Sequence, residues 1–317
     1  MSYAYDPELA DVAADAATMP PIDVTDLANA RSANREMTQA LGHPDQSGVV
    51  IRDLVVPARE GSHNVPLRIY TPEYGAKPAA MFDVHGGGYM VGDLEMLHRR
   101  NLQLCRELGI ILVAVDYRLA PEHPFPAALN DCYSGLCWLA DHARDLGVDP
   151  DRIAIHGVSA GGGLCAALAL LARDHGGPAI CFQYLAAPEL DDRLETPSMQ
   201  TFHDTPYWSR PNAEISWDAY LGDGMRGTAD VSHYASPARA KDLRGLPRAY
   251  VSAMQFDPLR DEGIDYALGL LAAGVTVELH LFPGTFHGSA LVEHARISQR
   301  ELTEEVRVLQ HALTLGA

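Results

Sequence analysis

A serine in a glycine-rich turn is the residue of this chain best placed to do chemistry. An apolar, strand-like stretch ends at His156, Gly157–Gly161 has the pattern Gly-x-Ser-x-Gly, and an Ala/Leu-rich helix follows. A serine in so tight a turn is usually held at positive φ, and the two glycines remove Cβ atoms from crowded backbone. The pattern predicts that Ser159 presents a nucleophilic hydroxyl above a sheet. A plain turn or a helix N-cap is the alternative.

A serine hydroxyl needs a base to take its proton, and chain order selects one histidine among 14. On an α/β-hydrolase scaffold, the acid and then the histidine follow the serine, each in the loop after a strand. The loop Pro283–Gly288 follows the last predicted strand and contains His287. His280 lies within the strand pattern, and His294 and His311 lie in the final helix. We therefore predict His287 as the base.

The acid that would orient His287 is expected after the preceding strand. Asp257 comes directly behind that strand, where its carboxylate can meet the far nitrogen of the imidazole. Asp261 is the alternative. Together with Glu262 it falls on the next helix, where acids in the first turn favour the helix dipole. We predict Asp257 as the orienting acid.

The oxyanion formed in acyl transfer needs hydrogen-bond donors, and two stretches can provide them. The amide of Ala160 directly follows the serine, and the triple glycine of His85-Gly86-Gly87-Gly88 follows another predicted strand. Three glycines let amides face a substrate without interfering side chains. The stretch lacks the ending of a P-loop and the spacing of a dinucleotide-binding turn. We predict Gly87, Gly88 and Ala160 as donors.

Strands and helices must alternate for these residues to meet. Strand patterns at 49–56 and 65–70 indicate a hairpin at a sheet edge. The further predicted strands are Ala80–Val84, Ile110–Asp116, Arg152–His156, Ile180–Ala186, Arg248–Ala253 and Thr276–Phe282. Helical patterns at 94–108, 126–143, 160–174, 261–273 and 290–313 separate most of them. We predict an α/β fold whose mostly parallel, eight-stranded sheet has helices on both faces.

Two parts of the chain depart from this alternation. Residues from about Asp6 to Leu41 carry two helical patterns split by Met19-Pro20-Pro21, and neither is long or apolar enough to form a domain. The interval 188–246 has no clean strand and is rich in aromatics, which suits a lid over the carboxyl ends of the strands. The alternative is that such rings only pack the insertion onto the sheet. Candidate residues for an apolar pocket are Tyr89, Met90, Tyr207, Trp208, Trp217 and Met254.

Composition limits the partners and the location. The 317 residues include 24 basic and 42 acidic ones, and the net charge of −18 repels nucleic acid and anionic membranes. No apolar run is long enough to span a membrane, and no signal-peptide pattern is visible. The five scattered cysteines form no Cys-x-x-Cys motif. We expect a cytoplasmic protein without a disulfide framework or a zinc site.

These motifs together resemble the hormone-sensitive-lipase-like (family IV) branch of the α/β-hydrolase carboxylesterases, from about Val50 to the end of the chain. The resemblance also includes Val115–Ala128, Leu190–Arg193 and Asp257–Gly263. It implies a triad, an oxyanion hole, and a cap built from residues 1–47 and 188–246 on a catalytic domain of residues 48–317. It further implies a homodimer. Val158 is a departure, since the family usually has Asp or Thr before the serine. We expect it to alter stability or substrate preference without loss of activity.

The same resemblance implies that Asp116, Arg118 and Glu122 form a polar network that braces the oxyanion loop. The predicted function is a serine carboxylesterase acting on small to medium uncharged acyl esters through an acyl-enzyme, without a metal or organic cofactor. An amidase, a lactonase or a deacetylase on the same scaffold is an open alternative. A non-catalytic small-ligand binding protein is more remote, because such proteins typically lose the base.

Overall fold

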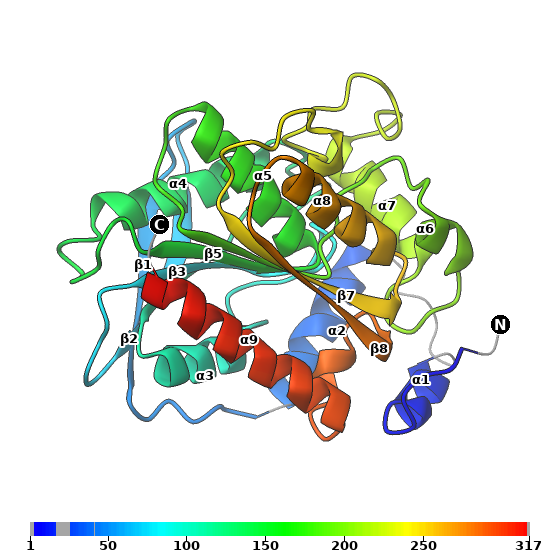
Figure 1. The fold of residues 1–317 in the computed structure, drawn as a ribbon, viewed down its shortest axis with the longest axis horizontal. Helices are drawn as coiled ribbons and strands as arrows, with labels where there is room; N and C mark the ends of the chain where they lie inside the picture. Colours follow the sequence, from blue (N-terminus) through cyan, green and yellow to red (C-terminus); the bar gives the residue numbers. More distant parts are fainter. Residues whose placement is uncertain (1–2, 17–25, 41, 316–317) are drawn as a thin grey trace.

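The computed structural model describes residues 3–16, 26–40 and 42–315. Within these residues an eight-stranded sheet has the order β1-β2-β4-β3-β5-β6-β7-β8 (Figure 1). The strands are β1 (Val49–Pro57), β2 (Asn64–Pro72), β3 (Ala80–Val84), β4 (Ile111–Val115), β5 (Ile153–Val158), β6 (Phe182–Ala186), β7 (Arg248–Phe256) and β8 (Val277–Phe286). β1–β2 and β2–β4 are antiparallel, and the other pairs are parallel. The predicted sheet and its edge hairpin are confirmed.

Helices cover both faces of the sheet (Figure 1). On one face lie α4 (Ala127–Asp141), α5 (Ala160–Asp174) and α8 (Arg260–Ala272), and on the other lie α3 (His98–Leu108) and α9 (Arg296–Leu315). Leu168 of α5 belongs to the larger core cluster, whereas Leu309 of α9 belongs to the cluster on the opposite face. Because both faces are covered, β3 and β4 are buried along their whole length.

The described residues form four further helices that flank this core. α1 (Ala10–Ala16) and α2 (Leu27–Ala40) precede the sheet, and the Met19-Pro20-Pro21 break between them lies outside the described residues. α6 (Pro197–Thr201) and α7 (Arg210–Leu221) occupy the interval between β6 and β7, together with a 3-10 helix at Pro237–Arg239. Of these, α6 packs against α8 (Figure 1). None of the described helices has the length and apolar character needed to span a membrane.

The end of the sheet differs from its predicted outline. β8 continues to Phe286, so most of the predicted loop Pro283–Gly288 is strand, and a 3-10 helix at Ser289–Leu291 delays the start of α9 to Arg296. Gly284, which suggested a turn, lies against the N-terminal segment instead: its carbonyl accepts the Asp6 amide at 2.9 Å. A Cβ there would lie 2.7 Å from the Asp6 nitrogen. The glycine therefore permits close backbone approach and does not end the strand.

Strand register brings two predicted site residues together. Phe256 of β7 pairs with Phe286 of β8, beyond a register shift between Met254 and Phe256. The residues that directly follow these two are Asp257 and His287. Parallel pairing therefore delivers both side chains to the same edge of the sheet.

Candidate active site

Ser159 occupies the sharp turn from β5 into α5. Its φ of 58° and ψ of −123° lie in a region that L residues rarely adopt. The Ser159 amide donates to the Ala186 carbonyl at 2.8 Å, and its carbonyl accepts the Glu189 amide at 3.1 Å. A Cβ at Gly157 would lie 2.2 Å from the Gly161 carbonyl oxygen, so the turn requires a glycine there. The backbone geometry of the predicted turn is thus present.

Val158 supports this turn through packing. Its side chain is half-buried against the core cluster on the α3 and α9 face of the sheet. The hydrogen bonds that hold the turn come from the backbone of Ser159, which a valine side chain leaves undisturbed. The effect of Val158 on stability or substrate preference stays a prediction.

The structure joins Ser159, His287 and Asp257 by two hydrogen bonds. His287 Nε2 lies 3.0 Å from Ser159 Oγ, and His287 Nδ1 lies 2.7 Å from Asp257 Oδ2. The Asp257 side chain is fully buried, and its other oxygen accepts the Leu259 amide at 2.9 Å. Asp261 points elsewhere: it accepts the Ser198 amide at 2.7 Å. The carboxylate that reaches the histidine is therefore that of Asp257.

The glycine loop lies directly against the serine turn. A Cβ at Gly86 would lie 3.2 Å from Ser159 Cβ. Gly87 and Gly88 adopt φ values of 108° and 55°, which a side chain would strain. The Gly87 carbonyl accepts the Met90 amide at 3.0 Å, and the Gly88 carbonyl accepts the Ser216 hydroxyl at 3.0 Å. Both carbonyls therefore accept hydrogen bonds from groups of the protein itself.

Tyr117 and Arg31 brace this loop. The Tyr117 hydroxyl donates to the His85 carbonyl at 2.9 Å, and the two rings stack with centroids 4.2 Å apart. Arg31 of α2 donates through Nε to the Met90 carbonyl at 2.8 Å. The N-terminal helix α2 is thereby tied to the segment that follows the glycines.

Two members of the predicted network, Arg118 and Glu122, pair with residues outside the motif. Arg118 binds Asp131 of α4 at 2.8 Å, and Glu122 binds Arg31 at 2.8 Å. Burial raises the pKa of Asp116 to about 6, with a smaller contribution from a nearby carboxylate. Asp131 lies on the helix that follows the motif and Arg31 on a helix 91 residues before Glu122, so residue spacing within the motif could not indicate either partner.

Two of the predicted pocket residues lie beside His287. The Trp208 ring centroid is 5.9 Å from that of His287, and a Cβ at Gly88 would lie 2.6 Å from the indole edge. The Tyr207 ring lies 5.9 Å from Phe286 and remains 40% exposed. The insertion therefore places an indole over the glycine loop.

The other four predicted pocket residues pack in the interior. Each of Tyr89, Met90, Trp217 and Met254 is at most 4% exposed. Tyr89 stacks on Tyr220 of α7 at 3.9 Å, behind the glycine loop. These side chains offer no open surface to a substrate, so their prediction as pocket residues gains no support. Aromatic content alone could not distinguish rings that line a cleft from rings that dock an insertion.

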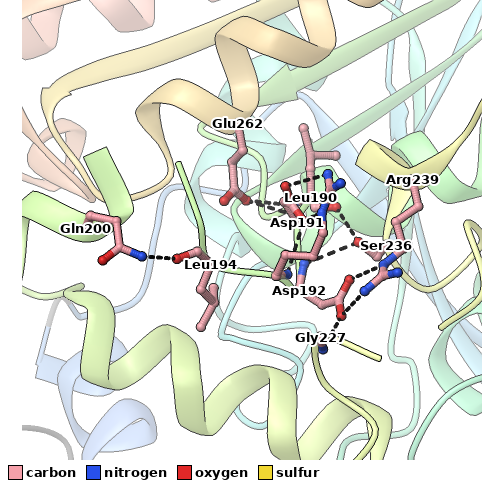
Figure 2. Close-up of polar contacts among 10 residues, drawn as sticks. Leu190, Asp191, Asp192, Leu194, Gln200, Gly227, Ser236, Arg239 and Glu262 are labelled. Atoms are coloured by element: carbon pink, nitrogen blue, oxygen red, sulfur yellow. Dashed lines mark hydrogen bonds and ion pairs between the residues drawn. The ribbon is translucent and has the colours of Figure 1, made fainter. Parts of the chain in front are cut away.

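The motif Leu190–Arg193 forms part of a buried polar cluster, shown in Figure 2. Glu262 of α8 accepts the Leu190 amide at 2.6 Å, and Asp192 pairs with Arg239 at 2.5 Å. Ser236 donates to the Leu190 carbonyl at 2.9 Å. Burial raises the pKa of Glu262 well above its ordinary value. The cluster fixes the loop after β6. Glu189 lies in this loop, directly before Leu190.

Sequence reasoning missed Glu189 and Ser216. Glu189 is bonded through its amide to Ser159, and Ser216 through its hydroxyl to the Gly88 carbonyl. A single glutamate within the apolar run Ala186-Ala187-Pro188-Glu189-Leu190 was the available signal of an unusual environment. Ser216 carried no comparable signal.

The model of the family described as having the alpha/beta hydrolase fold matches residues 81–291. Carboxylic ester hydrolase LipN of Mycobacterium tuberculosis is 37% identical over 268 residues, which are 83% of this chain and 70% of the relative. The ethyl acetate hydrolase of Pseudomonas putida is 30% identical and covers 88% of each chain. The solved structure of a bacterial heroin esterase has a TM-score of 0.94 and 48% identity over 98% of each chain.

The chain belongs to the α/β-hydrolase family, in the hormone-sensitive-lipase-like branch to which its motifs pointed. It is an enzyme, a carboxylic ester hydrolase.

Proposed function

We propose that this protein is a serine carboxylesterase that hydrolyses small to medium uncharged acyl esters through an acyl-enzyme. The observation that carries the proposal is the continuous hydrogen-bonded path from Asp257 through His287 to the Ser159 hydroxyl. A buried carboxylate on Nδ1 selects the tautomer whose Nε2 can accept a proton from serine. The strained turn beside a glycine loop supports the same assignment.

In the first half of the reaction, Ser159 Oγ bonds to the ester carbonyl carbon while its proton passes to His287 Nε2. The oxyanion accepts hydrogen bonds from the amides of Gly87, Gly88 and Ala160. His287 then gives its proton to the alcohol oxygen as the carbon–oxygen bond breaks, which leaves an acyl-enzyme.

In the second half, His287 takes a proton from water, whose oxygen attacks the acyl carbon. The same amides hold the second oxyanion. The proton returns to Ser159 Oγ as its bond to the acyl carbon breaks, and the carboxylic acid leaves. Asp257 stays ionised and stabilises the imidazolium in both halves.

The proposed cap consists of residues 1–47 and 188–246 on a catalytic domain of residues 48–317. Arg31 supports this, because it joins α2 to the segment behind the glycine loop. Trp208 and Ser216, in the second part of the cap at residues 188–246, also support it, since both contact Gly88. The cytoplasmic location remains a prediction, with which the five free, buried cysteines agree.

The proposed substrate range follows from the enclosure of the site. Ser159 is only 6% exposed, and the Trp208 ring occupies space over Gly88. Apolar walls around a nearly buried hydroxyl favour short, uncharged acyl groups. The relative named for ethyl acetate is consistent with a short acyl chain.

A series of chromogenic esters with increasing acyl length tests both activity and range. We expect the highest kcat/KM for short chains, together with covalent labelling by a fluorophosphonate that is lost in Ser159→Ala. Turnover of matched amides or lactones above that of esters would favour the amidase or lactonase alternative. Labelling and turnover that persist in Ser159→Ala would refute the assigned nucleophile.

A further inference from the structure

Glu189 is a fully buried carboxyl group one contact away from the nucleophile. Its amide donates to the Ser159 carbonyl at 3.1 Å, and its carbonyl accepts the Tyr89 hydroxyl at 3.1 Å. Within the described residues, neither carboxyl oxygen has a hydrogen-bond partner of standard geometry. A buried carboxylate without partners is strongly disfavoured, so the environment selects the neutral acid.

The titratable groups that act on Glu189 in the described chain are all acids. Two are carboxyl groups, Asp257 after β7 and Glu262 of α8. The others are phenols: Tyr89 after the glycines, Tyr117 after β4 and Tyr220 of α7. Burial raises the pKa of the Glu189 carboxyl to about 8, with Asp257 adding to the rise and Ser216 opposing it. The group is therefore neutral at pH 7 and becomes charged in mildly alkaline solution.

Ser216 lies next to this carboxyl, where its hydroxyl favours the charged form, and it connects the carboxyl to the glycine loop. The Ser216 hydroxyl is fully buried and donates its one proton to the Gly88 carbonyl at 3.0 Å. Its oxygen retains lone pairs and can accept from a protonated carboxyl. An ionised carboxyl is an acceptor only, and it attracts a hydroxyl proton more strongly than a carbonyl does.

We propose that Glu189 is a positioning residue whose neutral carboxyl, acting through Ser216, keeps the Gly88 carbonyl bound and the oxyanion loop in its active geometry. When Glu189 loses its proton, the Ser216 hydroxyl turns from Gly88 to the new carboxylate. The Gly88 carbonyl then has no donor, and the neighbouring amides lose their fixed direction. Esterase activity falls as a result on the alkaline side. This inference rests on the proposed function of the loop.

The test is the dependence of kcat on pH, between pH 6 and pH 10, with a short chromogenic ester. For the wild type we expect a loss of about tenfold between pH 7 and pH 9, as for any rate that requires one protonated group. Glu189→Gln keeps a donor that cannot ionise, so its alkaline limb should disappear. Ser216→Ala should lower kcat at every pH, with a smaller change in KM, and also lose the limb.

Glu301→Gln is the matched control. Glu301 of α9 is also buried, burial raises its pKa to about 8 as well, and one of its oxygens lacks a partner among the described residues. It lies in the helix on the opposite face of the sheet, so its variant should keep the wild-type alkaline limb. An unchanged limb in Glu189→Gln, or its loss in Glu301→Gln, would overturn the proposal.

A readout that does not depend on catalysis separates this inference from the proposed function. In protein labelled with ¹⁵N-glycine, the Gly88 amide signal should shift with pH in the Ser159→Ala background, and this shift should vanish when Glu189→Gln is added. If the signal shifts but the wild type has no esterase activity, the proposed function is wrong and the coupling between Glu189 and the loop stands. If the wild type is active but the signal does not shift, the proposed function stands and the coupling is wrong.

Discussion

The imidazole of His156 lies with Nδ1 2.7 Å from the Asp83 carboxylate, its direct partner on the neighbouring strand. Its Nε2 lies 3.0 Å from Glu305 of α9. His156 is buried three residues before Ser159. Its contact with Glu305 therefore ties the strand that leads into the serine turn to the final helix. Burial lowers the pKa of His156, but the hydrogen bonds to both carboxylates outweigh this and raise it to about 9.

Stability should therefore fall in alkaline solution. The pKa of His156 is higher in the folded than in the unfolded chain, so its contribution is complete below pH ~6.5 and is lost as pH rises through about 9. We expect the free energy of unfolding in urea to drop by on the order of 3 kcal/mol across this window. His156→Gln should flatten the drop, whereas His280→Gln, at a partly exposed pair with Glu304, should not. A pH-independent wild type would contradict the argument.

Asp257→Asn should lower kcat by roughly 10⁴-fold while leaving the fold intact, because the amide favours the wrong imidazole tautomer. Asp261→Asn is the control: that carboxylate binds the Ser198 amide and not His287. Its kcat should stay within a few-fold of the wild type. Steady-state kinetics on both variants measure the difference, and equal losses would mean that the orienting acid was misassigned.

Gly88→Ala keeps its backbone amide but should displace it, and we expect kcat to fall by roughly 10²- to 10³-fold, as when one oxyanion donor is lost. Its Cβ would lie 2.6 Å from the Trp208 indole, so the loop or the ring must shift. Gly147→Ala places a side chain at a comparable positive φ with nothing within 4 Å. It should cost some stability and no activity. Thermal melts and ester turnover separate strain from site damage.

Arg239→Ala should destabilise the protein by about 3–5 kcal/mol, because it leaves the fully buried Asp192 carboxylate unpaired. Arg244→Ala removes an ion pair with Asp242 at the surface and should leave the free energy of unfolding nearly unchanged, because solvent screens this pair. Urea unfolding gives both values. Equal effects would show that the cluster in Figure 2 adds little to the fold.

Much of the site was predictable from local sequence. The turn at Ser159 and the glycine loop at Gly87 need special backbone conformations, and glycine spacing reports such needs directly. His287 and Asp257 followed from strand order, because parallel strands end at one edge of a sheet. The alternation of strand and helix patterns was enough to predict the fold.

Tertiary packing decided the rest. Tyr89 and Trp217 are as aromatic as Trp208, yet only the folded chain places them behind the glycine loop and leaves Trp208 beside His287. The ion-pair partner of Glu122 is Arg31, 91 residues earlier in the chain, and residue type does not reveal which distant side chain will neutralise a charge. A backbone conformation is local, and the sequence alone determined it. Burial and pairing depend on the approach of remote segments, and they exist only in the assembled structure.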